Sequence, residues 1–197
     1  MTITADQVKQ LREMTGAGMM ECKKALAETG GDLNKAIDAL RKAGIAKAEK
    51  RADRAASQGR VESYVHDSRI GVLVEVNCET DFVARTDDFR TLCRDLAMQV
   101  AAAAADYVRR EEVPAERIER ERAIYRDQVK NEGKPAAIAD KIVDGKLNKF
   151  YGEVCLLEQA FIKDDKIVVG DLVKQMSSKT GENIVVRRFV RVRLGAE

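Results

Sequence analysis

The chain has 197 residues, of which 35% are charged and 45% hydrophobic, yet its formal net charge is only +2. This length is enough to bury a substantial core in one or two small domains. The balance of charges excludes the one-signed surface of a dedicated nucleic-acid binder, and no apolar run is long enough to span a membrane. Because the opening MTITADQ also has no secretory or transit pattern, we expect a soluble, cytoplasmic protein.

The first 44 residues predict a bundle of three short helices joined by glycine-containing turns. Residues 4–7, TADQ, form a capping box that starts the first helix. A second helix follows, and Asp32 caps a third, which Gly44 is expected to close. The charged, alanine-rich stretch at 45–58 has little apolar face, so it predicts a connector helix.

Residues 59–197 predict an α+β core in which helices pack on an antiparallel sheet. The runs GRVESYVH (59–66) and IGVLVEVNC (70–78) alternate as strands do, and the short turn between them makes them antiparallel neighbours. A further strand is expected at 153–157. Helices are expected around 89–100, 116–129, 136–150 and 171–176, and a last strand at 183–194.

The predicted helix at 116–129 is mostly charged and has two interpretations. Its apolar residues form only a thin line of Ile118, Tyr125 and Val129. In the first interpretation the helix is solvated and laced with ion pairs such as Glu116–Arg120. In the second, the thin line packs on a partner.

The last predicted strand has one apolar and one basic face. Ile184, Val186, Val190, Val192 and Leu194 alternate with Arg187, Phe189, Arg191 and Arg193. The arginines are interleaved with valine rather than with stacking aromatic residues, which favours a solvated sheet face over an RNA site. An RNA- or ribosome-binding adaptor that uses this strand is the alternative function.

Catalytic and metal-binding patterns are absent from the sequence. The four cysteines lie far apart without a CxxC pair, and we expect reduced core thiols at Cys22, Cys78, Cys93 and Cys155. The only histidine, His66, lies at a strand end, where a polar turn residue is a simpler interpretation than a base or ligand. We therefore expect no enzymatic activity, no cofactor and no metal.

The stretch VNCETDFVAR (76–85) places a large apolar ring directly after a turn. A strand-like run leads into Thr80 and Asp81, and Phe82 follows. Phe82 either folds back into the core, as most phenylalanines do, or is held outward. In the second interpretation Asp81 caps a helix that begins near Phe82 or Val83.

These motifs resemble those of one protein family. The segments TGAGMMECKKAL and GGDLNKAIDALRKAG resemble the amino-terminal module of bacterial elongation factor Ts, a three-helix bundle similar to ubiquitin-associated (UBA) domains. VNCETDFVAR is similar to the second family signature, and the likeness continues through GKPAAIADKIVDGKLNKFYGEVCLLEQAFIKD over nearly the whole chain. One departure is Glu21, where the family more often has aspartate.

The resemblance implies a guanine-nucleotide exchange factor. Such a factor binds elongation factor Tu·GDP, displaces Mg²⁺ and promotes GDP release during translation elongation. The residues that would dislocate Mg²⁺ in the partner are Thr80, Asp81, Phe82 and Val83. Further partner contacts are implied at Met19, Met20 and Lys23, although Met19 also suits the core of the bundle.

The resemblance also implies a homodimer. Longer family members contain a duplicated core, whereas this chain has room for one copy, so two chains would supply what the duplication supplies elsewhere. The residues agree, because an open edge strand with valines on one face is a liability that a twofold pairing covers. The alternative is that the arginines of this strand keep a monomer soluble. No direct contact with nucleic acid or membrane is expected.

Overall fold

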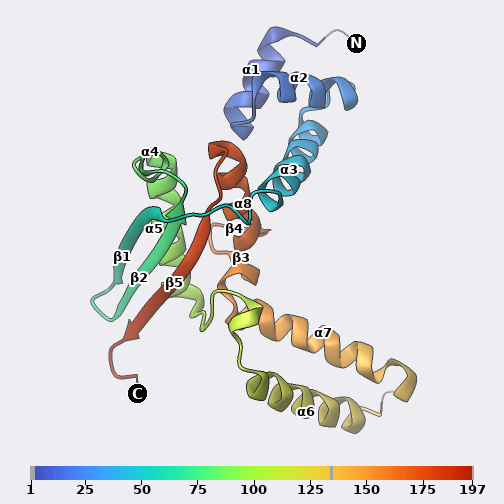
Figure 1. The fold of residues 1–197 in the computed structure, drawn as a ribbon. Helices are drawn as coiled ribbons and strands as arrows, with labels where there is room; N and C mark the ends of the chain where they lie inside the picture. The colour runs from blue at the N-terminus through green and yellow to red at the C-terminus, as the bar shows by residue number, and fades with distance from the viewer. Residues whose placement is uncertain (1–2, 134, 197) are drawn as a thin grey trace. The chain divides into compact units, whose positions relative to one another are not determined.

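The computed structural model describes residues 3–133 and 135–196 and shows the predicted α+β class (Figure 1). The chain forms two compact units, each assembled from separate segments. Unit 1 comprises Met1–Arg60, Val76–Leu92 and Asp171–Val185, and unit 2 comprises Val61–Glu75, Cys93–Gly170 and Val186–Glu197. No helix within the described residues has the length and apolar character needed to cross a membrane.

The predicted three-helix bundle lies in unit 1. Its helices are α1 (Ala5–Thr15), α2 (Met19–Glu28) and α3 (Leu33–Glu49). The capping box is present, because the Thr4 hydroxyl accepts from the Gln7 backbone N–H and the Gln7 side chain accepts from the Thr4 backbone N–H. The helices enclose a small core of Val8, Leu11, Cys22, Ala25, Leu26 and Ala36.

Helix α3 continues through Gly44, so the prediction that this glycine ends the helix is wrong. Residues 45–49 belong to α3, and residues 50–54 form turns, so no separate connector helix occupies 45–58. Gly44 has a different use. A Cβ added there would lie 2.9 Å from Oγ of Ser178, so the absence of a side chain permits close packing of α3 on the segment that carries Ser178.

The main sheet has the strand order β1-β2-β5. Its strands are β1 (Gln58–His66), β2 (Ile70–Cys78) and β5 (Val185–Arg193). The predicted turn between β1 and β2 places Asp67 and Ser68 at φ 47° and 53°, as tight hairpins of this hand require. β2 alternates as predicted and buries Val72, Val74, Val76 and Cys78.

β5 lies at an edge of this sheet. Val186 near its start is buried, whereas Val190 and Val192 are exposed. Phe189 and Arg191, which alternate with them, are half-buried. The outer part of β5 therefore presents apolar side chains to solvent.

The charged helix α6 (Ala115–Asn131) packs against α7 (Ala136–Val154). Its thin apolar line, Ile118, Tyr125 and Val129, contacts a cluster that includes Val143 and Leu147 of α7. The apolar line of α6 is thus covered by residues of the same chain. The other faces of the helix are solvated.

The strand predicted at 153–157 is wrong. Glu153 and Val154 end α7, and Leu156–Glu158 form a turn of 3-10 helix. Strands come slightly later, as the antiparallel pair β3 (Ala160–Phe161) and β4 (Asp164–Val168). Val154, Cys155 and Leu156 are all buried. Consecutive buried residues show no period that separates a strand from a helix.

Three further helices complete the described structure that bears on the site. They are α4 (Asp81–Ala84), α5 (Asp87–Ala103) and α8 (Val169–Thr180). α5 buries its predicted stripe of Phe89, Leu92, Leu96 and Val100. α8 is longer than the predicted helix at 171–176, and from Asp171 onward it belongs to unit 1.

Candidate functional site

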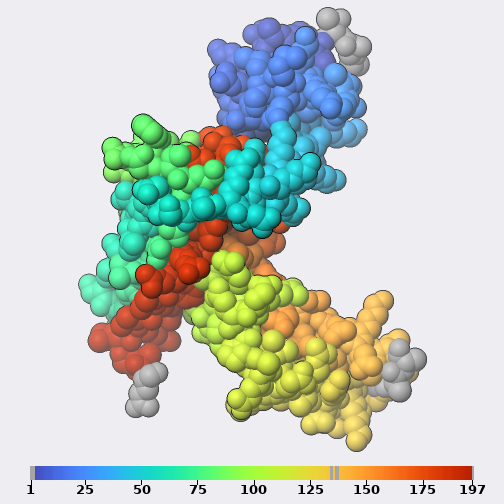
Figure 2. All heavy atoms as spheres, in the orientation of Figure 1, coloured from blue at the N-terminus to red at the C-terminus, as the bar shows by residue number. Residues whose placement is uncertain are grey.

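Helix α4 carries the ring for which the sequence left two interpretations. It directly follows β2, and none of its residues is buried. Phe82 is 81% exposed, the largest value among the exposed large hydrophobic side chains of the described residues. The interpretation of Phe82 as a core residue is therefore wrong. The green atoms of the α4 segment accordingly lie at the molecular surface in Figure 2.

The start of α4 is fixed by Thr80 rather than by Asp81. The Thr80 hydroxyl accepts from the Val83 backbone N–H at 3.4 Å, so Thr80 is the N-cap, and the prediction that Asp81 caps the helix is wrong. The helix begins one residue earlier than expected, which places Asp81 in its first turn. There the Asp81 carboxylate pairs with Arg85 at 2.9 Å.

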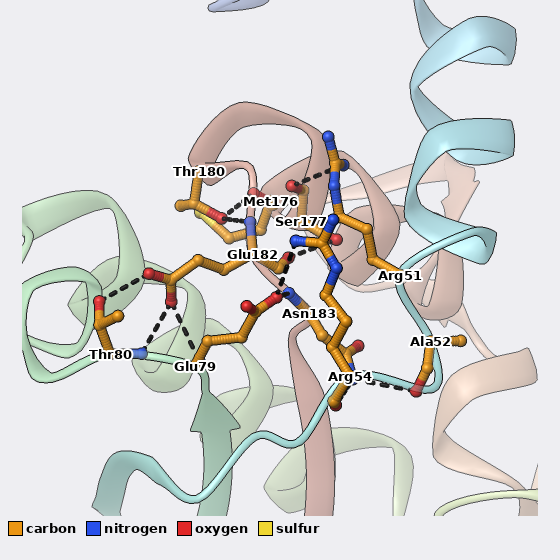
Figure 3. Close-up of polar contacts among 10 residues, drawn as sticks. All are labelled: Arg51, Ala52, Arg54, Glu79, Thr80, Met176, Ser177, Thr180, Glu182 and Asn183. Carbon is orange, nitrogen blue, oxygen red and sulfur yellow. Dashed lines mark hydrogen bonds and ion pairs between the residues drawn. The ribbon is translucent and has the colours of Figure 1, made fainter.

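Glu182 binds the residues just before α4. Its Oε2 accepts from the backbone N–H groups of Glu79 and Thr80 at 3.0 and 3.1 Å. Its Oε1 accepts from the Thr80 hydroxyl at 2.6 Å. Figure 3 shows the Glu182 side chain reaching from the turn after α8 to this segment.

Asn183 joins the same turn to two other segments. Its backbone N–H donates to Oε1 of Glu79 at 2.6 Å, and the same carboxylate pairs with Arg54 at 3.6 Å. The Asn183 side-chain amide donates to the carbonyls of Ala52 and Arg54 at 3.0 and 2.8 Å. The turn after α8 therefore connects the chain before α4 with the segment that follows α3 (Figure 3).

No pattern in the sequence marks Glu182 or Asn183 as residues that contact the site. Both follow Gly181, at a place where polar residues normally form a solvated turn. Their partners lie about a hundred residues away in the chain, so no local spacing marks them. Only an alignment that paired them with Glu79 and Thr80 would have supplied a signal.

The implied contacts on the bundle lie on the first turns of α2. Met20 is 75% exposed and Met19 is 48% exposed, so the interpretation of Met19 as a core residue is wrong. Lys23 is exposed as well. Glu21 pairs with Lys47 of α3, and this hydrogen bond lowers the pKa of the Glu21 carboxyl.

The described residues contain no group of three or more His, Cys, Asp or Glu side chains that could hold a metal ion. All four cysteines are buried and outside disulfides, as predicted. Burial is the main cause that raises the pKa of the Cys78 and Cys155 thiols to about 11, which keeps them protonated at neutral pH. His66 is exposed at the end of β1, where its Nδ1 lies 3.1 Å from the Tyr64 hydroxyl.

The basic residues of β5 are partly engaged within unit 2. Arg188 pairs with Glu75 at 2.7 Å, and Arg191 donates to the carbonyl of Ala101 at 3.3 Å. Arg187 and Arg193 are exposed. The strand therefore offers a shorter basic face than its sequence suggests.

Comparisons with known proteins agree over almost the whole chain. Residues 4–196 match the family described as Elongation factor TS. The chain is 60% identical over 194 residues to elongation factor Ts of Heliobacterium modesticaldum, covering 98% of this chain and 90% of that protein. It is 59% identical over 196 residues to elongation factor Ts of Coprothermobacter proteolyticus, covering 99% and 100%, respectively. For elongation factor Ts of Thermodesulfovibrio yellowstonii the identity is 55% over 195 residues, covering 99% and 98%.

An α+β core that holds an exposed aromatic ring, together with these matches, defines the class as translation elongation factors. Sequence identity of this degree over nearly the whole chain is enough to identify the family, and the fold is not needed for that step. The chain belongs to the elongation factor Ts family.

Proposed function

We propose that the chain is a guanine-nucleotide exchange factor that binds elongation factor Tu·GDP, displaces Mg²⁺ and promotes GDP release. Family membership supports the choice of partner. The single observation that carries the mechanism is the exposure of Phe82 on a segment tied to its surroundings. The protein acts in the cytoplasm as a binding partner without chemistry of its own and needs no cofactor.

The segment Thr80–Val83 is the wedge in this proposal. It enters beside the nucleotide site of the GTPase and disturbs the contacts to Mg²⁺ and phosphate. A protein that binds the nucleotide-free GTPase more tightly than the loaded form weakens nucleotide binding by the same factor. The acceleration therefore applies to GDP and GTP alike.

The ring of Phe82 supplies part of the required coupling. Burying one such ring contributes about 1.5–3 kcal/mol. If this is realised only in the nucleotide-free complex, it changes nucleotide affinity about ten- to hundredfold. One ring is therefore significant but insufficient, and a broader interface contributes the remainder.

The amino-terminal bundle contributes to that interface. Residues 1–44 act as the UBA-like binding module, with Met19, Met20 and Lys23 as contacts, and residues 59–197 act as the core for partner binding and dimerisation. The exposure of both methionines on one helix start supports this assignment, since exposed apolar side chains at a helix end favour a protein contact.

The proposed assembly is a homodimer. The exposed apolar residues Leu73, Val190 and Val192 belong to the strands of unit 2, and β5 is an edge strand. A second copy of the same surface would remove these side chains from water through a twofold axis. Neither nucleic acid nor membrane is a partner.

Release of labelled GDP from purified elongation factor Tu tests the function directly. We expect micromolar concentrations of the chain to accelerate release of both GDP and GTP. The absence of any acceleration refutes the proposal.

An RNA- or ribosome-binding adaptor remains the second candidate, because Arg187 and Arg193 of β5 are exposed. Binding to phosphates weakens steeply as salt rises, whereas a hydrophobic wedge is much less sensitive. Measuring partner binding between low and high salt therefore separates the two functions.

A further inference from the structure

Helix α4 cannot hold its own conformation. It has only four residues, and an isolated helix of this length is far below the length at which helices become stable in water. None of its side chains is buried, and Phe82 contributes almost no packing because its ring is exposed. The conformation that presents Phe82 must therefore be imposed by residues outside the helix.

Glu182 provides this constraint through Thr80. A hydroxyl group has one proton to donate and lone pairs to accept with. The Thr80 hydroxyl donates its proton to Oε1 of Glu182, so a lone pair remains to accept from the Val83 N–H, which is the bond that caps α4. The bond to Glu182 thus sets the rotation of the hydroxyl that starts the helix.

Two more contacts of Glu182 fix the backbone on which Thr80 lies. Oε2 accepts from the N–H groups of both Glu79 and Thr80, and hydrogen bonds to a carboxylate are stronger than those between neutral groups. A reciprocal bond runs from the Asn183 N–H to the Glu79 carboxylate. Residues 79–80 and 182–183 are therefore joined by reciprocal hydrogen bonds, in which the glutamate of each segment accepts from the backbone of the other.

Glu182 is itself held by the end of α8. Gly181 has φ 77°, a left-handed conformation that ends the helix, and its N–H donates to the carbonyl of Ser177 at 3.0 Å. The Ser177 hydroxyl, which is buried, donates to the carbonyl of Glu182 at 2.5 Å. Glu182 therefore follows directly after the hydrogen-bonded end of α8 (Figure 3).

We propose that Glu182 is a positioning residue for nucleotide exchange, which holds the Thr80–Val83 segment in the conformation that presents Phe82. This inference rests on the proposed function and extends it to a residue outside the Thr80–Val83 segment. Within the described residues, the Glu182 side chain makes its hydrogen bonds to Glu79 and Thr80. Its loss therefore releases the start of α4 while leaving the cores of both units unchanged.

The first experiment measures the free protein and does not depend on the partner. Hydrogen–deuterium exchange is followed for the peptide that covers residues 79–85 in the unmodified chain, Glu182→Ala and Glu182→Gln. Alanine removes all three acceptor contacts, so exchange of the Glu79, Thr80 and Val83 amides should rise about tenfold or more. Glutamine keeps one acceptor oxygen of the same reach, so an intermediate rise is expected.

A matched control is Glu158→Ala. Glu158 is also a half-buried glutamate, and it pairs with Arg110 in unit 2. Within the described part of the chain, the hydrogen bonds of its carboxylate go to Arg110 and none goes to α4. Its loss should leave hydrogen exchange at residues 79–85 and GDP release unchanged, which separates the loss of Glu182 from the loss of any half-buried carboxylate.

The second experiment measures GDP release from elongation factor Tu as the concentration of each variant rises. Glu182→Ala should lower the maximal rate about tenfold, with little change in the concentration for half-maximal rate, because the rest of the interface is intact. Glu182→Gln should restore part of the rate. When Phe82→Ala is already present, adding Glu182→Ala should have almost no further effect, since the two residues act through one group.

Several outcomes overturn the inference. They are unchanged hydrogen exchange at 79–85, an unchanged maximal rate despite faster hydrogen exchange, and full additivity with Phe82→Ala. If the unmodified chain fails to accelerate release at all, the proposed function is wrong and the exchange role of Glu182 is wrong with it. The hydrogen-exchange result then still decides whether Glu182 orders α4.

Discussion

Phe82 combines an exposed ring with a constrained backbone, and its removal should affect function and stability differently. Phe82→Ala should change the free energy of unfolding by no more than about 0.5 kcal/mol, as surface substitutions do. It should lower the maximal rate of GDP release about ten- to hundredfold. Thermal melting and labelled-nucleotide release measure the two effects.

Phe89→Ala is the matched control, because Phe89 lies seven positions further on and is fully buried. Removing its ring should cost about 3–5 kcal/mol of stability. If Phe82→Ala loses much stability while its folded fraction still promotes GDP release at the normal rate, the proposal that Phe82 acts as a wedge is contradicted.

Cys78 is the last residue of β2 and lies just before the Thr80–Val83 segment that is proposed as the wedge. Its Sγ donates to the carbonyl of Thr80 at 3.1 Å, and burial raises the pKa of its thiol from 9.0 to about 11. The neutral thiol is favoured in the folded state, so its contribution to stability is complete below pH 9.0 and is lost as the pH rises toward about 11.

The raised pKa of Cys78 predicts that its thiol reacts slowly with alkylating reagents in the native protein. Iodoacetamide at pH 8 should modify Cys78 far more slowly in the native protein than in urea, because the reactive thiolate is both rare and inaccessible. Peptide mass spectrometry after timed alkylation measures the two rates. Equal rates in the native and unfolded protein would show that β2 opens at this end.

At the scale of elements, the contact between α3 and α8 depends on Gly44. In most helix interiors, replacing glycine by alanine stabilises a protein by up to about 1 kcal/mol. Gly145 of α7 has nothing within 4 Å of an added Cβ, so Gly145→Ala should show this gain in the free energy of unfolding.

Gly44→Ala places a Cβ 2.9 Å from Ser178 Oγ, so for this variant the gain in the free energy of unfolding should be absent or reversed. Urea unfolding of both variants tests the difference, and equal gains would exclude a tight contact.

The surface of α2 should affect partner binding without affecting exchange at saturation. Combined replacement of Met19, Met20 and Lys23 by alanine should weaken binding of nucleotide-free elongation factor Tu about tenfold and leave the maximal exchange rate nearly unchanged. Met14→Ala is the control, because Met14 is 60% exposed on α1 but is not among the proposed contacts. Calorimetric titration measures the affinities, and unchanged affinity in the combined variant removes the bundle from the interface.

At the scale of the whole molecule, the exposed strands of unit 2 predict a dimer. Sedimentation at micromolar concentration should give twice the chain mass of 21.9 kDa. Val190→Lys should shift the protein toward the monomer, because it places a charge in a surface that the partner copy would cover. Reductant should have no effect, since none of the four cysteines lies in β5.

Ile124→Lys is the control for this substitution. Ile124 is 41% exposed on α6, so it introduces the same charge at another apolar surface position of unit 2. A monomer mass for the unmodified chain refutes the dimer, and dissociation by both variants would move the contact away from β5.

The sequence by itself determined the parts of this protein that depend on neighbours along the chain. Four local features form as predicted: the capping box at Thr4–Gln7, the Asp32 cap, the hairpin turn at Asp67–Ser68 and the alternation of β2. Each is decided by residues a few positions apart, because capping, turn geometry and side-chain alternation are local. The signature VNCETDFVAR indicated a candidate site through its resemblance to the family, and that assignment stays a prediction.

Tertiary structure decided the features whose partners lie far apart in the chain. Glycine at position 44 predicts a helix end, yet α3 continues through it. Gly44 instead lies inside the helix, where it packs closely against Ser178. Within the run at 153–157, Val154, Cys155 and Leu156 are consecutive and all buried, so no periodicity separated helix from strand. Phe82 is exposed on a helix too short to be stable alone. The residues just before that helix, Glu79 and Thr80, are hydrogen-bonded to Glu182, about a hundred residues away. Local pattern cannot encode such a contact, because hydrogen bonds between distant segments exist only after both segments have folded.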